Sequence, residues 1–96
     1  MSVAIMSLIY KTPLGSPSLK AVALKLADCA NDEGRSIYPS KQTIADQTEL
    51  GLSTVKECVS ELMAMGVLLC EEASAGGHRG ETTVYAFDLE ALASLP

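Results

Sequence analysis

The side chains best suited to nucleophilic or metal chemistry in this sequence are three cysteines and one histidine. Cys29, Cys58 and Cys70 are odd in number, lie far apart and form no Cys-x-x-Cys pair. This spacing predicts neither a disulfide framework nor a zinc site. We therefore expect all three cysteines to be buried thiols. His78 is the only histidine and has no partner at ligand spacing, so we expect it to bind no metal.

The acidic and hydroxyl side chains do not form a catalytic arrangement either. No pair of carboxylates is fixed beside a histidine or a nucleophile, and the Ser, Cys and His residues form no recognisable triad. Gly76, Gly77 and Gly80 resemble a phosphate-binding loop, but they do not stand at a strand-to-helix turn with a Lys-Ser or Lys-Thr pair. The sequence therefore predicts a protein that is not an enzyme, with no catalytic residues and no cofactor.

The charge balance limits which large partners the chain can bind. There are 7 Lys and Arg residues against 12 Asp and Glu residues, which gives a formal net charge of -5. A protein whose whole surface binds nucleic acid is normally basic, so any contact with DNA must come from a local patch. The longest apolar stretch, residues 3–10, is too short to span a bilayer and lacks the features of a secretory signal. We expect a cytoplasmic protein with no membrane partner.

The elements that must position these side chains fit one small domain, because 96 residues cannot supply two independent cores. Ser16 before Pro17 is typical of a helix start, and apolar residues at helical spacing continue to Ala30. Ser40 predicts a second helix start, with a short helix to about residue 47. Its expected inward-facing residues are Ile44 and Ala45.

A third helix is predicted from Leu52 or Ser53 to Gly66, where glycine favours a left-handed cap. Its expected inward face recurs every three or four residues and consists of Val55, Val59, Leu62 and Met63. Residues 67–70 and 82–87 predict a hairpin with a long tip, and residues 36–38 predict a short strand. Asp88 is expected to cap a last short helix. Residues 2–11 are compatible with either a helix or a strand.

This order of elements predicts an α+β fold, namely a winged helix-turn-helix with a three-helix core and a small antiparallel β-hairpin wing. We expect a single domain with an N-terminal extension (1–15), a core of three helices (16–66), the wing (67–87) and a C-terminal short helix (88–96). In such a fold the third helix normally enters the major groove and the hairpin lies along the DNA backbone.

Two stretches also carry a family resemblance. LADCANDEGRSIYPSKQTIADQT (26–48) and LSTVKECVSELMAMGVL (52–68) resemble the helix-turn-helix domains of bacteriophage and prophage replication or regulatory proteins. The resemblance covers about residues 20–69 and implies double-stranded DNA as the partner. Leu52 and Glu57 depart from the basic residues usual in the family, and this departure removes attraction to the groove and adds repulsion.

The candidate binding surface combines the predicted outward face of the third helix with two flanking positions. The expected outward residues of the helix are Leu52, Ser53, Lys56, Glu57, Ser60 and Glu61, and the first five of them are proposed to bind the partner. Lys41, in the first turn of the second helix, is placed where such domains commonly touch a phosphate. His78 and Arg79 at the predicted hairpin tip are placed to contact a minor groove.

Two functions from different classes follow from this surface. The favoured one is a small phage or mobile-element regulator that binds DNA. We expect it to bind as a homodimer, because one subunit carries few cations and would bind DNA weakly by itself. The alternative is an acidic winged helix that binds a basic host protein, as an inhibitor of host defence of the anti-CRISPR kind would. Residues 3–10 and the C-terminal leucines offer apolar surface for dimerisation unless they pack on each other within the chain.

Overall fold

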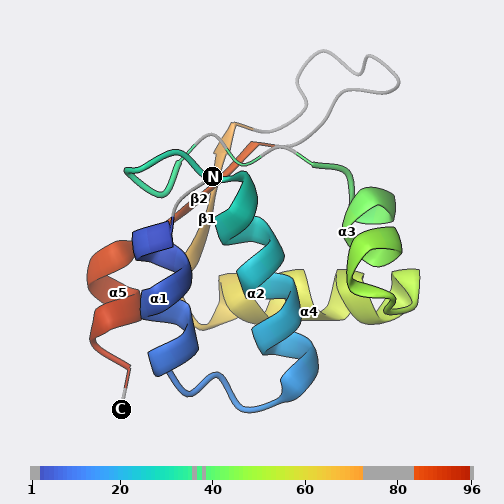
Figure 1. Cartoon of the computed structure of the whole chain (residues 1–96), viewed down its shortest axis with the longest axis horizontal. Coiled ribbons are helices and arrows are strands. Elements are labelled where there is room, and N and C mark those ends of the chain that lie inside the picture. The colour runs from blue at the N-terminus through green and yellow to red at the C-terminus, as the bar shows by residue number, and fades with distance from the viewer. Residues whose placement is uncertain (1–2, 36, 38, 73–83, 96) are drawn as a thin grey trace.

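Five helices and one small sheet make up the part of the chain that the computed structural model describes, which is residues 3–35, 37, 39–72 and 84–95. Their bounds are α1 Val3–Lys11, α2 Pro17–Cys29, α3 Lys41–Thr48, α4 Leu52–Ala64, β1 Leu68–Glu72, β2 Val84–Phe87 and α5 Leu89–Ala93. In Figure 1, α2 runs through the middle, α1 and α5 lie on one side of it, and α3 lies on the other. This combination of helices and a small antiparallel sheet is the one expected of the α+β class.

Helix α2 is the central element, and it contacts α1, α3 and α4. The Ser16 side chain caps its first turn by accepting a hydrogen bond of 3.1 Å from the Leu19 amide, and Pro17 follows at the first helical position. One face of the helix is buried from its first turn to its last, as its apolar spacing predicted. Its buried residues are Leu19, Val22, Ala23, Leu26 and Ala27.

Helix α3 begins at the second predicted cap. Ser40 Oγ accepts a hydrogen bond of 3.0 Å from the Thr43 amide, and the inward positions Ile44 and Ala45 are buried. The helix ends at Thr48, and the capping residue Glu49 after it has a φ of 63° in the left-handed region. This conformation is uncommon for a residue with a side chain, and it turns the chain sharply toward α4.

Helix α4 begins at Leu52 as expected and ends at Ala64, shortly before the predicted Gly66, which has the expected positive φ of 81°. Its inward face differs from the prediction at one position, because Met63 is 40% exposed whereas Cys58 is buried. Each residue turns the helix by roughly 100°, so Met63 lies about 100° beyond Leu62 and outside the buried stripe. Cys58 lies one turn before Leu62 and so occupies the stripe.

The sheet is a two-stranded antiparallel pair in which Leu68 is opposite Phe87. Ile37 adds a single bridge on β2, with two backbone hydrogen bonds to Tyr85 of 3.0 and 2.7 Å. Of the predicted strand at residues 36–38, this bridge is the part that lies within the described residues. The predicted hairpin tip lies outside them.

The two ends of the described chain join the same core. The N-terminal segment, which the sequence predicted as either a helix or a strand, is helix α1. Its Ile5 and Ile9 belong to one buried cluster with Leu92 of α5. Gly34 lies close to both helices, since a Cβ added there would be 3.0 Å from Ile5 Cδ1 and 3.2 Å from Leu89 Cδ2. The apolar stripes of α1 and α5 are therefore buried within the chain, although Val3 and Tyr10 of α1 stay exposed.

Lys20 of α2 binds the end of α1. Its Nζ donates to the carbonyl oxygens of Ile9, Tyr10 and Thr12 at 2.8, 3.1 and 2.5 Å. The last carbonyls of a helix have no partner within the helix and carry partial negative charge, so an ammonium group is suited to them. The contact attaches α1 to α2.

We predict that Lys20→Met lowers the free energy of unfolding by about 1.5–3 kcal/mol, because the apolar stem is kept and the charged hydrogen bonds are lost. Urea denaturation followed by circular dichroism measures this change. Lys25→Met is the matched control, because Lys25 lies on the same helix and forms a 3.3 Å ion pair with Asp28 that is partly exposed. The control should change stability by less than about 0.5 kcal/mol. Equal losses in the two variants would contradict the role of Lys20.

Candidate nucleic-acid interface

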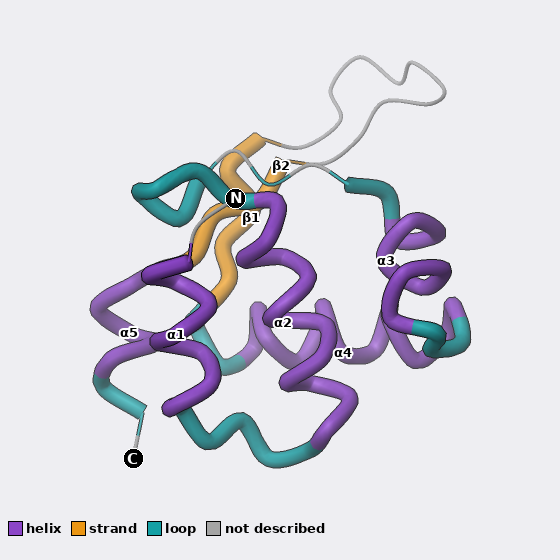
Figure 2. Tube along the Cα trace, viewed as in Figure 1, coloured by secondary structure: helices purple, strands orange, loops and turns teal. Residues whose placement is uncertain are grey.

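Helices α3 and α4 form a pair joined by the short link at residues 49–51. They pack against each other and both pack on α2. Figure 2 shows α3 standing steeply against the line of α4, with the link at one end of the molecule. The side of α4 that packs inward is fully buried and consists of Val55, Cys58, Val59 and Leu62. Burial of this stripe fixes the rotation of α4 about its own axis.

The opposite side of α4 is open to solvent. The two chain ends pack elsewhere, so the described part of α1 and α5 leaves this side uncovered (Figure 1). The exposed residues on it are Ser53, Lys56, Glu57, Ser60 and Glu61. Four of them, Lys56, Glu57, Ser60 and Glu61, line a shallow open depression. The structure thus brings together Ser53, Lys56, Glu57 and Ser60 with Glu61, which the sequence also placed on the outward side. Leu52, at the start of the helix, is exposed on the side nearer the buried stripe.

The charge of this face is mixed and slightly negative. Lys56 contributes +1, and Glu57 and Glu61 contribute -1 each, so the three together sum to -1. No ion pair joins these three side chains. Among the described residues, the ion pair present is that between Lys25 and Asp28. The lysine and both carboxylates are therefore available to an external partner.

Lys41 is engaged within the chain. Its Nζ donates a 3.1 Å hydrogen bond to the Tyr85 hydroxyl and lies 5.7 Å from the centroid of the Tyr85 ring. Tyr85 is buried in β2, so this contact connects the first turn of α3 to the sheet. The phosphate contact proposed for Lys41 stays a prediction, and it would compete with this bond. The predicted contacts of His78 and Arg79 lie outside the described residues.

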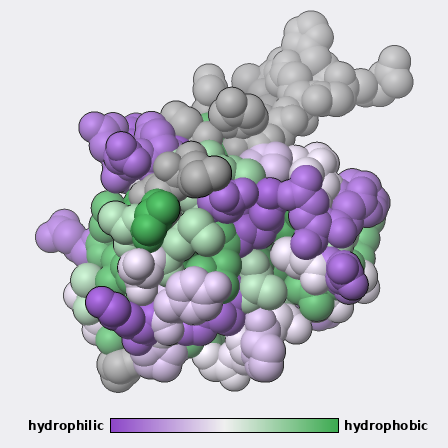
Figure 3. Space-filling view, viewed as in Figure 1, coloured by the Kyte–Doolittle hydropathy of each residue, from purple (hydrophilic) through white to green (hydrophobic). Residues whose placement is uncertain are grey.

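In the view of Figure 3, hydrophilic (purple) and hydrophobic (green) residues are interspersed on the described surface. Lys41, which the sequence offered as a surface cation, has a structural partner instead, and so has Lys20, to which the sequence assigned no role. Lys20 binds the end of α1, and Lys41 binds Tyr85. Neither partner was visible in the sequence, because each contact joins residues on different elements.

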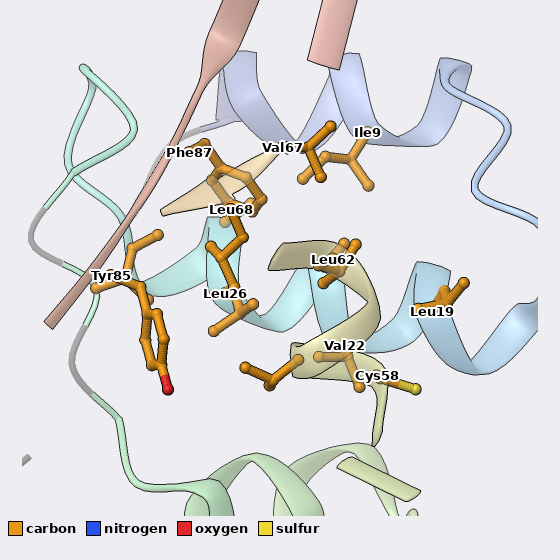
Figure 4. Close-up of a cluster of buried hydrophobic side chains, with 14 of the residues drawn as sticks. Ile9, Leu19, Val22, Leu26, Cys58, Leu62, Val67, Leu68, Tyr85 and Phe87 are labelled. Carbon is orange, nitrogen blue, oxygen red and sulfur yellow. The ribbon is translucent and has the colours of Figure 1, made fainter. Parts of the chain in front are cut away.

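The expectation of three buried cysteines is wrong for two of them. Cys58 is buried, Cys29 is half-buried and Cys70 is exposed. Cys70 is exposed because it lies on the short strand β1, in a pair of strands that covers only part of the core. Figure 4 shows Cys58 in the cluster beneath α4, together with Val22 of α2. Burial raises the pKa of the Cys58 thiol, and the nearby negative charges of Glu61 and then Glu57 raise it further.

These features define a helix-turn-helix protein: a capped short helix, a sharp link, and a second helix locked by one face and open on the other. Residues 16–68 match the family model of the helix-turn-helix domain, and because this is more than half of the chain, the protein belongs to that family. The match begins at the Ser16 cap and ends at the first residue of β1. Searches of curated proteins and of solved structures find no significant match.

Two further findings apply to the described part of the chain. No helix in it is long and apolar enough to cross a membrane. No group of three or more His, Cys, Asp or Glu side chains in it is placed to hold a metal ion.

We predict that a thiol reagent at pH 8 labels Cys70 fastest and labels Cys58 at least roughly a hundredfold more slowly. The reactive species is the thiolate, and the raised pKa of Cys58 leaves less of it at this pH, while burial blocks access. Mass spectrometry of labelled peptides over time measures both rates. In urea the two rates should converge. Rapid labelling of Cys58 in the folded protein would show that the inward face of α4 is not packed as described.

Proposed function

We propose that this protein binds double-stranded DNA through the outward face of α4, which enters the major groove. The observation that carries this proposal is the open face itself: α4 is held by its buried stripe within a helix-turn-helix domain, and its exposed side chains have no partner in the described chain. A helix of this kind is the usual reader of base edges in the family fold. The pair β1 and β2 would then act as the wing along the DNA backbone.

The supply of cations argues for two copies on one site. Lys20, Lys25 and Lys41 are engaged within the chain, and Lys56 is the one lysine on the α4 face. Each neutralised phosphate contributes slightly less than one unit to the slope of log affinity against log salt. Because one subunit can neutralise few phosphates, it would bind DNA weakly by itself. We propose that a homodimer binds two half-sites. Together with the resemblance to phage and prophage proteins, this supports a small cytoplasmic regulator from a mobile element.

A second candidate function is supported by the acidity of the same region. Glu57 and Glu61 on α4, Asp46 on α3 and Glu49 in the link are all exposed. An acidic face is complementary to a basic protein surface, such as the nucleic-acid channel of a host defence complex. In this case α4 would bind protein and reject DNA.

The experiment that separates the two functions neutralises Lys56. We predict that Lys56→Gln weakens DNA binding about equally for all sequences and lowers the slope of log affinity against log salt by about one unit. Fluorescence anisotropy with labelled duplex at several salt concentrations measures both effects. Lys11→Gln is the matched control, because Lys11 is an exposed lysine at the end of α1, on another element.

The control should bind DNA as the unchanged protein does. Equal weakening by both substitutions would place the contact outside α4. If the unchanged protein shows no salt-dependent binding to any duplex and instead binds one basic protein, the DNA function is wrong and the second candidate holds.

A further inference from the structure

The outward face of α4 has a central row and two flanks. Each residue turns an α-helix by roughly 100°, so the side chains of Ser53, Glu57 and Ser60 lie within about 30° of the direction opposite the buried stripe. Lys56 and Glu61 lie about 70° from that direction, one on each flank. All five residues are exposed. A helix that enters a groove along this direction therefore presents the central row to the groove floor and the flanks to its walls.

Glu57 is the long, charged side chain of the central row. Its row neighbours Ser53 and Ser60 are small, so they allow the helix to approach the bases closely. Lys56 is adjacent in sequence but does not pair with Glu57, because neighbours in a helix point in different directions and no bond between them is present. The carboxylate is free to accept hydrogen bonds from a partner.

The chemistry of a carboxylate restricts what it can contact in DNA. It accepts hydrogen bonds and is repelled by phosphates, and in the major groove the donors are the amino groups of cytosine and adenine. The adenine amino group lies between two acceptors, its own N7 and thymine O4. The cytosine amino group has an acceptor, guanine O6, on one side only. A carboxylate at the groove floor therefore favours cytosine.

We propose that Glu57 is a specificity residue that accepts a hydrogen bond from the amino group of one cytosine in each half-site, while Lys56 on the flank binds a phosphate. This inference rests on the proposed DNA function. The proposal explains why α4 carries acidic residues. On a sequence without the cytosine, the carboxylate would face hydrogen-bond acceptors and phosphates, and this repulsion rejects the sequence. Discrimination then comes from repulsion as well as attraction.

The test is selection from a duplex library with a randomised segment, using the full chain and its Glu57→Gln variant. The unchanged protein should select cytosine at one position of the half-site. A glutamine amide donates and accepts and is matched to adenine N6 and N7. We therefore predict that Glu57→Gln changes the preference at that position alone from cytosine to adenine. Its affinity for the cytosine site should fall roughly tenfold while its affinity for unrelated duplex rises.

Glu61→Gln is the matched control, because it removes the same charge from the flank of the same helix. It should raise the affinity for all sequences about equally and leave the selected bases unchanged. If Glu57→Gln does no more than this, Glu57 acts only by repulsion, and the proposed reading of cytosine is wrong even though the protein binds DNA. If the unchanged protein selects no duplex at all, the proposed function fails and the inference fails with it.

Discussion

Burial of one side of α4 is the constraint on which the rest of the structure depends. Val55, Val59 and Leu62 are almost fully buried, and complete burial of each such side chain stabilises the fold by about 1.5–3 kcal/mol. A helix with this stripe has one favourable rotation about its axis, and that rotation determines which residues face outward. Figure 4 shows why α2 matters here: its Val22 and Leu26 belong to the same cluster. The exposed face is thus a consequence of the core.

The sheet is connected to the helix pair through Tyr85. Its backbone forms the bridge to Ile37, and its hydroxyl accepts the hydrogen bond from Lys41 of α3. A single buried residue, through its backbone and its side chain, therefore joins the segment before α3, the first turn of α3 and the strand β2. This arrangement relates the position of the proposed wing to that of the helix pair, so a partner that engages both meets a surface of defined shape.

Local signals in the sequence predicted most of the fold, whereas contacts between distant elements were missed. The caps at Ser16 and Ser40 could be predicted because a cap needs only its own turn. Lys20 was missed because its carbonyl partners lie on another helix. Met63 was assigned to the wrong face of α4 because spacing alone does not decide where a buried stripe ends. Cys70 was wrongly predicted to be buried because the burial of a strand residue depends on what covers the sheet. The exposed face of α4 could be predicted because it lies opposite the apolar stripe, which the sequence shows directly.

The most direct measurement of the central claim is amide chemical-shift mapping by NMR during titration with a short duplex taken from the selected library. If the outward face of α4 meets the DNA, the largest changes should fall on residues 52–61, and the amides of α1 and α5 should change little. The opposite pattern, with the largest changes on α1 and α5 and none along α4, would show that another surface binds DNA and would contradict the account.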